Sequence, residues 1–252
     1  MRFSFTNLAH RPWPLPRGPW IMAQRWHDVL FAHWRVPPES LRPLIPEGLG
    51  LDLFQGQAWL GVVPFRMTGV RPRLVPPLPW LSAFPELNVR TYVVAGGKPG
   101  VWFFSLDAGN RLAVTVAHAW FRLPYYRARM NISEEGDRIF YSSVRTHKGA
   151  ESAEFVGNYR ATGTPFAAAR GTLEHFLTER YCLYTSDPQR RIYRGEIHHA
   201  PWPLQLAEAE IQRNTMAAPL GIRLPQELPL LHFSRRQDVV VWGLKPLHRW
   251  VK

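Results

Sequence analysis

Short runs in which apolar and polar residues alternate recur along the chain, and turns that contain proline or glycine separate them. The 24 prolines and 18 glycines are spread over the whole sequence, with no repeat of fixed period. Such even interruption is typical of β-rich folds, in which many turns join short strands. We therefore expect a mostly β (β-rich α+β) fold with a few short helices. Because no stretch has the composition of a linker, we assign residues 1–252 to a single domain.

The alternation and the turns also predict where the elements lie. We expect one hairpin from residues 49–54 and 58–65, and a second from residues 84–94 and 101–107. Further extended segments are expected at residues 125–132, 138–146, 154–159, 191–198, 206–213, 230–234 and 239–242. Short helices are expected at residues 37–46, at 110–120 with Asn110 as N-cap, and at 172–181 with Thr172 as N-cap. The proline cluster at residues 72–79 is expected to be a surface loop.

The most regular alternation lies in residues 86–93. On a strand, one face of this segment would carry Glu86, Asn88, Arg90 and Tyr92, and the other Leu87, Val89, Thr91 and Val93. A half-exposed strand with a solvated face would show the same alternation. However, Asn and Tyr between an acid and a base are unusual on a solvated face, so the alternative is a polar row that lines an internal pocket.

Glu86 and Arg90 would then flank such a pocket. Four residues apart on a strand, their Cα atoms are separated by about 13 Å, at about 3.3 Å per residue. A buried Glu has a raised pKa and can act as a general acid or base, while an Arg can bind a carboxylate through two hydrogen bonds. The pair therefore favours a small acidic ligand.

Two further clusters could contribute to a pocket. Alternation places Tyr125, Arg127 and Arg129 on one face of a strand, although Arg side chains that reach into water would give the same pattern. In residues 198–204 two prolines enforce an irregular backbone, next to which Trp202 could form an apolar wall and His199 a polar contact.

The formal charge is +12, from 31 Lys and Arg against 19 Asp and Glu, and only four of these cations are Lys. An excess of Arg is compatible with nucleic acid or anionic substrates, and equally with the composition of the genome. Because the Arg residues are dispersed without a basic run, nucleic-acid binding is the least favoured of these interpretations.

Several classes of protein have no signature here. The ten His residues form neither a His-Glu-x-x-His pattern nor a Cys/His set with ligand spacing, and no glycine-rich nucleotide motif or Gly-x-Ser-x-Gly turn is present. We therefore expect no metal and no cofactor. The single Cys182 lies between apolar neighbours and is expected to be buried. Neither a secretory signal nor an apolar run of about 18 residues occurs, which predicts a cytoplasmic protein without a membrane partner.

The sequence resembles the bacterial family called domain of unknown function 2071, whose members are similar in fold to acetoacetate decarboxylase. The resemblance spans nearly the whole chain. It rests on His33-Trp34-Arg35-Val36-Pro37, Pro46-Glu47-Gly48-Leu49, residues 86–93, Phe103-Phe104-Ser105-Leu106-Asp107, Leu123-Pro124-Tyr125, Glu179-Arg180-Tyr181 and His199-Ala200-Pro201-Trp202-Pro203-Leu204. It implies a cone-shaped, mostly antiparallel barrel around a central pocket, faced by Glu86, Asn88, Arg90 and Tyr92.

In the decarboxylases that this family resembles, a Lys in a Gly-aromatic-Pro-Lys-Lys segment forms a Schiff base with the β-keto acid. The similar segment here is Arg122-Leu123-Pro124-Tyr125-Tyr126, where tyrosines replace the lysines. The four lysines of the chain lie in turns, before a proline or at the last residue, so none is expected to be desolvated as a Schiff-base lysine must be.

The resemblance leaves two classes of function open. One is a lyase or hydratase acting on a keto or enol acid, with Glu86 moving a proton and Tyr125 polarising a carbonyl. The other is a non-catalytic protein that binds a small acidic or aromatic ligand. In both, the expected ligand-binding residues are Asn88, Arg90, Tyr92, Arg127, His199 and Trp202. Assembly into a homo-oligomer is also left open.

Overall fold

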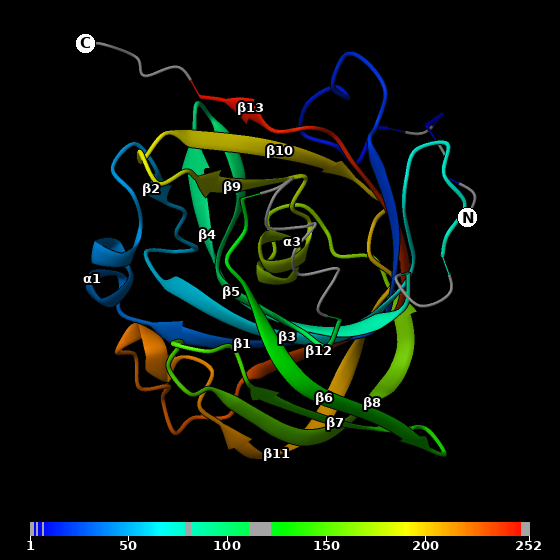
Figure 1. The fold of residues 1–252 in the computed structure, drawn as a ribbon, viewed down its shortest axis with the longest axis vertical. Helices are drawn as coiled ribbons and strands as arrows, with labels where there is room; N and C mark the ends of the chain where they lie inside the picture. Colours follow the sequence, from blue (N-terminus) through cyan, green and yellow to red (C-terminus); the bar gives the residue numbers. More distant parts are fainter. Residues whose placement is uncertain (1–2, 4, 7, 79–81, 111–121, 248–252) are drawn as a thin grey trace.

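Strands make up most of the computed structural model, which describes residues 3, 5–6, 8–78, 82–110 and 122–247 (Figure 1). The strands are β1 (Met22–Val36), β2 (Gly50–Leu51), β3 (Ala58–Pro72), β4 (Phe84–Ala95), β5 (Lys98–Ala108), β6 (Tyr125–Glu135), β7 (Arg138–Arg145), β8 (Glu154–Phe166), β9 (Cys182–Ser186), β10 (Ile192–His198), β11 (Leu204–Asn214), β12 (Leu230–Val241) and β13 (Lys245–Pro246). The helices are α1 (Pro38–Leu41) and α3 (Leu173–Thr178), with 3₁₀ turns at Arg42–Leu44 and Ala218–Leu220. The expected mostly β fold with a few short helices is confirmed.

All of these strands pair in one sheet, in the order β13-β10-β9-β5-β6-β7-β8-β11-β12-β1-β3-β4-β2. Two further pairings, β4 with β5 and β10 with β12, close this sheet on itself. They produce two rings that share β1, β3, β4, β5 and β12. The larger ring is completed by β6, β7, β8 and β11, and the smaller by β9 and β10. The pairs are antiparallel except for β5 with β6 and β5 with β9. In Figure 1 the strands of the smaller ring surround α3.

Because they belong to both rings, the shared strands are buried on both faces over much of their length, as β4 is from residue 86 to residue 93. Leu87 and Val89 of β4 pack into one apolar cluster with Phe155 of β8, inside the larger ring. The opposite face of the shared strands contributes to a second cluster, to which Phe31 of β1 belongs. The polar residues that alternate with Leu87 and Val89 are therefore enclosed by protein and not solvated.

Several predicted elements are confirmed. The hairpin of β4 and β5 forms as expected, and Thr172 caps α3 by accepting a hydrogen bond from the backbone N–H of His175 at 3.3 Å. This helix ends at Thr178, three residues before the predicted end, and β9 begins at Cys182. Residues 230–234 and 239–242 are the two ends of one strand, β12.

The hairpin expected from residues 49–54 and 58–65 is wrong. Only a single bridge joins Phe54 to Gln57 around the turn, and β2 pairs instead with Val93 and Val94 of β4. Strand β1 was not expected at all, and neither was β9. Apart from Asn110, the predicted helix at 110–120 lies outside the described residues.

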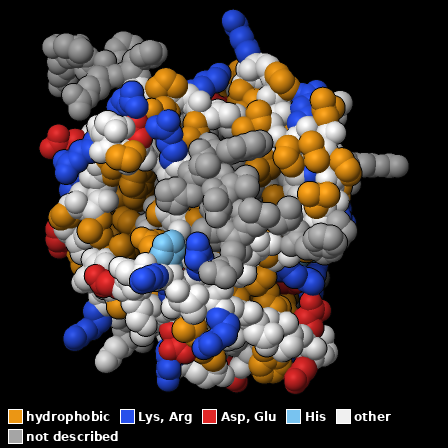
Figure 2. All heavy atoms as spheres, in the orientation of Figure 1, with side chains coloured by type: hydrophobic (Ala, Val, Ile, Leu, Met, Phe, Trp, Pro, Cys, Tyr) orange, Lys and Arg blue, Asp and Glu red, His pale blue; other side chains and the backbone are white. Residues whose placement is uncertain are grey.

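No large basic patch is seen among the described residues on the face drawn in Figure 2. On the face drawn in Figure 2, the Lys and Arg side chains are scattered among acidic and apolar ones. Many Arg side chains are paired, as Arg25 is with Asp238 at 2.6 Å and Arg160 with Glu208 at 2.9 Å. Among the described residues, no helix is long and apolar enough to cross a membrane.

Candidate functional site

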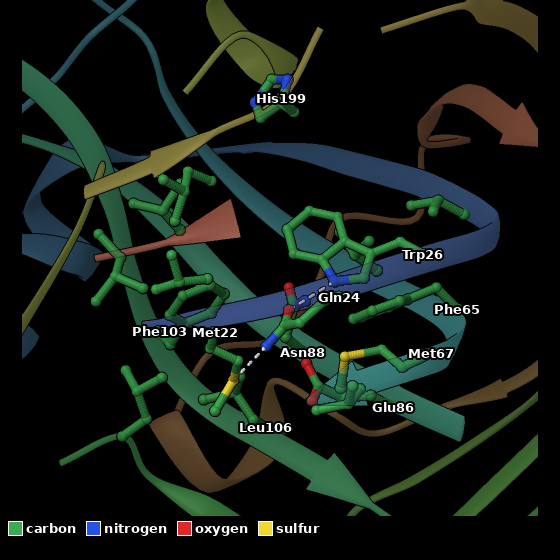
Figure 3. Close-up of a pocket in the computed structure, with 18 of the residues that line it drawn as sticks. Met22, Gln24, Trp26, Phe65, Met67, Glu86, Asn88, Phe103, Leu106 and His199 are labelled. Carbon is green, nitrogen blue, oxygen red and sulfur yellow. Dashed lines mark hydrogen bonds between the residues drawn. The ribbon is translucent and has the colours of Figure 1, made fainter. Parts of the chain in front are cut away.

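A cavity of about 360 Å³ lies within the smaller ring. Residues of β1, β3, β4, β5, β9 and β10 line it, together with the end of α3 and residues that follow β10. Most of its wall is apolar, with Phe65, Met67, Phe103 and Leu106 among the side chains drawn in Figure 3. A concave, mostly apolar cavity with a few polar groups is the usual form of a site for a small molecule.

Three of the polar residues on this wall come from β4: Glu86, Asn88 and Arg90. They are 3%, 5% and 8% exposed, respectively. On the neighbouring strand β3 they lie opposite Phe65, Val63 and Gly61. The polar face that period two predicts on this strand is therefore the face that meets the cavity.

Glu86 and Tyr125 form a buried pair. The Tyr125 hydroxyl donates a hydrogen bond to Oε2 of Glu86 at 2.9 Å. Burial raises the pKa of Glu86 to about 8, with the hydrogen bond from Tyr125 acting in the opposite direction and Asp107 adding to the rise. Burial and the Glu86 carboxyl also raise the pKa of Tyr125 well above its usual value. At neutral pH most Glu86 side chains therefore carry a proton, which is lost as the pH rises through about 8.

Arg90 is a buried cation without a nearby anion. Its guanidinium lies 5.3 Å from the ring centroid of Phe31, and Nη2 donates a long hydrogen bond of 3.4 Å to the carbonyl of Leu177. Among the described residues, no carboxylate lies within 4.0 Å of it, and Nε has no hydrogen-bond partner. Two other buried Arg side chains contrast with it, since Arg145 pairs with Asp107 and Arg180 with Asp52.

Gly61 leaves the room that Arg90 and its neighbour His33 use. A Cβ atom at this position would lie 3.0 Å from the ring of His33 and 3.4 Å from Cγ of Arg90. Burial and the charge of Arg90 hold the pKa of His33 well below its usual value, so this ring is neutral. It therefore does not add a second charge beside Arg90.

Tyr92 shares the face of Glu86 and Arg90 but lies beyond the end of the cavity, and the expectation that it faces the pocket is wrong. Its hydroxyl donates to the carbonyl of Leu177 at 2.7 Å and lies 2.6 Å from Nε2 of His33. Since α3 covers this end of β4, the Tyr92 side chain anchors the helix and does not line the cavity.

Arg127 was expected among the ligand-binding residues, but it is exposed on β6 and does not line the cavity. Only the first residue of this strand, Tyr125, reaches the cavity. Beyond Ala128 the strand pairs with β7 and extends away as a hairpin. Tyr126 points to the other side, where the guanidinium of Arg145 lies 4.1 Å from its ring centroid.

His199 and Trp202 both line the cavity and are held there by the segment after α3. A Glu179 carboxylate oxygen accepts the backbone N–H of Trp202 at 2.8 Å. The ring of Tyr181 stacks on His199 with centroids 4.6 Å apart. Burial lowers the pKa of His199, and its Nδ1 lies 2.7 Å from the carbonyl of Ala200. The two motifs at residues 179–181 and 199–204 thus build one corner of the wall.

Strand β1 contributes wall residues that the sequence pattern did not reveal. Met22, Gln24 and Trp26 line the cavity, and Figure 3 shows the Gln24 amide between the other two side chains. Its Oε1 accepts a hydrogen bond from Trp26 Nε1 at 2.9 Å. An irregularity follows at Asp28, whose φ is 54°, and it shifts the alternation so that Val29 and Phe31 face the cavity next. This change of phase conceals the strand from a search for strict alternation.

Arg180 is a second cation on the wall; it belongs to the motif Glu179-Arg180-Tyr181 but was not expected among the ligand-binding residues. None of the described lysines lines the cavity: Lys98 forms a salt bridge of 3.2 Å with Glu196, while Lys148 and Lys245 are exposed. Among the described residues, no group of His, Cys, Asp and Glu has an arrangement that could hold a metal ion.

The fold of this closed sheet is similar to that of acetoacetate decarboxylase-like proteins. The chain is similar to an acetoacetate decarboxylase with a TM-score of 0.65 and 14% identity, covering 94% of this chain and 92% of that one. The enduracididine biosynthesis enzyme MppR, solved with the condensation product of pyruvate and imidazole 4-carboxaldehyde, gives a TM-score of 0.65 at 12% identity, covering 92% and 91%. For acetoacetate decarboxylase from Legionella pneumophila the TM-score is 0.64 at 11% identity, with 97% and 96% covered.

Within this fold, the chain belongs to the family named domain of unknown function 2071, described as an uncharacterized conserved protein, whose model matches residues 23–238. It is also 50% identical over 249 residues to the uncharacterized protein YqjF of Bacillus subtilis (strain 168). That match covers 99% of this chain and 98% of its relative.

Proposed function

We propose that the cavity binds a small oxo or enol acid and that Glu86 transfers a proton to or from it, in lyase or hydratase chemistry without a Schiff base. The observation that carries this proposal is the presence of an uncompensated buried cation, Arg90, on the same wall as a buried carboxyl group of raised pKa, Glu86. A ligand carboxylate would supply the missing anion for Arg90. A C–H group next to a carbonyl would supply a proton that Glu86 can remove.

Arg90 would bind the carboxylate of the ligand. A buried charge without a counter-ion is costly, and a carboxylate that accepts hydrogen bonds from a guanidinium removes much of that cost. Arg180 can strengthen the local positive potential, although Asp52 already balances its charge. Asn88, between Glu86 and Arg90 on the strand, can hydrogen-bond the polar part of the same ligand, because its Oδ1 has no partner among the described residues.

Glu86 would act as the base or acid on the carbon next to the carbonyl. As a carboxylate it removes a proton from that carbon; the C–H electron pair forms a C=C bond, and the carbonyl π electrons move to oxygen. Tyr125 can donate its hydrogen bond to this oxygen, because the newly protonated Glu86 is a weaker acceptor. Return of the proton, or loss of a leaving group from the enolate, completes the reaction.

Solved relatives of the fold support an oxo acid as the ligand class. MppR has been solved with pyruvate bound and with a condensation product of pyruvate. The sequence identity of MppR to this chain is only 12%, so the likeness concerns the fold. The choice of an oxo acid as ligand therefore depends on Glu86 and Arg90 of this chain. Since no described lysine lines the cavity, the proposed chemistry uses proton transfer instead of an imine.

Proton exchange tests the proposal without knowledge of the natural substrate. We would incubate the protein with 2-oxobutanoate in D₂O, follow loss of the C3 proton signals by NMR, and measure binding by calorimetry. Glu86→Gln is expected to slow exchange at least about 100-fold while leaving binding nearly unchanged. Tyr125→Phe should slow exchange as well, and Tyr126→Phe, on the opposite face, is the matched control.

Binding has its own pair of variants. Arg90→Met is expected to weaken 2-oxobutanoate binding at least about tenfold, whereas Arg127→Met, on the exposed part of β6, should have no effect. If oxo acids bind through Arg90 but no exchange occurs, the protein is a non-catalytic binder of small carboxylates, which is the second candidate. If oxo acids do not bind, the proposal is wrong in both forms.

A further inference from the structure

One part of the cavity wall is mostly apolar. Beyond Glu86, towards the start of β4, the wall is formed by Met22, Trp26, Met67, Val70, Leu78 and Phe84, which we call the outer subsite, and the polar side chains of Gln24 and Ser82 lie beside them. Met67 pairs with both Phe84 and Trp26 in the sheet, so these three side chains lie side by side across three strands. The polar residues Asn88, Arg90, Thr178 and Arg180 lie on the other side of Glu86, towards α3.

The outer subsite continues to the surface through the segment after β3. Val75 and Leu78 line the cavity and are 40% and 51% exposed. Leu74, which is 90% exposed, belongs to the same segment but does not line the cavity. Figure 2 shows apolar side chains gathered on this side of the molecule, over the connection between β3 and β4. When half-exposed apolar side chains line a cavity, an apolar ligand that packs against them removes their apolar surface from water, which favours binding.

The volume of the cavity exceeds what a three-carbon oxo acid fills. A molecule of liquid water takes about 30 Å³, so 360 Å³ corresponds to about twelve non-hydrogen atoms, roughly twice the number in pyruvate. The additional space lies in the outer subsite, where no side chain other than Glu86 at its edge is charged. The polar side chains there are Gln24, whose amide already bonds to Met22 and Trp26, and Ser82, so we expect the extra atoms of a matching ligand to be mostly apolar.

We propose that the ligand is an amphipathic oxo acid: its carboxylate binds at Arg90, its reacting carbon lies at Glu86, and an alkyl or aryl group of about six non-hydrogen atoms fills the outer subsite. This inference rests on the proposed function and adds the class of the substrate side chain. It assigns the outer subsite the role of setting specificity for chain length.

A series of unbranched 2-oxo acids tests this assignment. Affinities of pyruvate, 2-oxobutanoate, 2-oxohexanoate and 2-oxooctanoate would be measured by calorimetry in one buffer. Each buried methylene is expected to strengthen binding about fourfold until the cavity is full. Affinity that stays the same or falls along the series would overturn the inference, even if pyruvate binds through Arg90.

Two leucines provide matched variants. Leu78→Asp is expected to weaken 2-oxooctanoate binding about tenfold and to leave pyruvate binding unchanged. Leu74→Asp changes the same residue type in the same segment but should affect neither ligand, and its φ of 66° is one that Asp tolerates. Equal effects of the two variants, or an equal loss for pyruvate, would contradict a role of Leu78 in the outer subsite.

A third variant fills the subsite from within. Val70→Trp should lower affinity for 2-oxooctanoate at least tenfold and spare pyruvate, with thermal unfolding measured to confirm that the chain remains folded. Octanoate, which lacks the oxo group, separates the two proposals. If octanoate binds as tightly as 2-oxooctanoate and no oxo acid of the series exchanges protons, the apolar subsite is supported and the catalytic proposal is wrong. If no acid of the series binds, both are wrong.

Discussion

Replacement of Glu86 by Gln removes a buried carboxyl group whose ionisation opposes folding. In the folded chain the pKa of Glu86 is about 8, against a usual value of 4.5. Between these two pH values the folded chain binds one more proton at this position than the unfolded chain does. The free energy of unfolding of the wild type therefore falls as pH rises through this range, relative to a variant that cannot ionise there.

The size of the effect follows from the two pKa values. At about 1.4 kcal/mol for each tenfold change in the ionisation equilibrium, the difference corresponds to about 5 kcal/mol as an upper limit. Local rearrangement lets water reach an ionised side chain and reduces this cost. We therefore expect the difference in free energy of unfolding between Glu86→Gln and the wild type to change by about 3–5 kcal/mol over this pH range. The free energy of unfolding of Glu86→Gln should thus change less with pH than that of the wild type. Its advantage over the wild type should increase with pH and reach its full value above pH 8.

Urea unfolding followed by circular dichroism at pH 5, 6.5, 8 and 9 measures this difference directly. At pH 5 the Glu86 of the unfolded chain is already mostly ionised, so the difference there contains the effect of the amide and the first part of the ionisation effect; the further change from pH 5 to pH 9 reports the remainder of the ionisation effect. Glu227→Gln, at an exposed position, is the control and should give a profile parallel to that of the wild type. If the profile of Glu86→Gln is also parallel to the wild type, Glu86 does not have a raised pKa and the assignment of its chemistry fails.

Three further changes test the structure around the site by thermal and urea unfolding. Arg145→Met leaves the buried Asp107 carboxylate, now held by hydrogen bonds of 2.7 and 2.9 Å, without its partner, and should cost about 3–5 kcal/mol; a loss below 1 kcal/mol would contradict the pair. Gly100→Ala places a Cβ 2.7 Å from Sγ and 2.8 Å from the carbonyl oxygen of Cys182, and a loss of about 1–3 kcal/mol is expected, whereas an unchanged midpoint would show that β5 and β9 are not this close. Thr172→Ala removes the N-cap of α3 and should cost about 1 kcal/mol, with Thr172→Ser restoring most of it.

The strands with strict alternation were predictable in advance. Residues 86–93 follow period two, and the turn after this strand contains glycines, so the hairpin of β4 and β5 and the shared face of Glu86, Asn88 and Arg90 follow from local chemistry. Thr172 as an N-cap is equally local, because it depends on residues within one helical turn.

Other elements depend on partners far away in the chain. Strand β1 changes phase at Asp28, and its two halves each face the cavity only because β3 and β12 pair on either side of it. The pairing of β2 with β4 instead of β3 likewise reflects competition between edges of the sheet, which no local pattern reveals. For the same reason the sequence could not show that Met22, Gln24 and Trp26 belong to the site.

By itself, the sequence determined which side chains share a face, because the period of a strand is a property of the backbone. Whether that face meets water or a cavity was decided by closure of the sheet, through the pairing of β4 with β5 and of β10 with β12. Because that closure excludes solvent from both side chains, the pKa of Glu86 is raised and the missing counter-ion of Arg90 is costly. Tyr92, on the same face, lies under α3 and outside the cavity, which shows that alternation assigns a direction and tertiary packing assigns the surroundings.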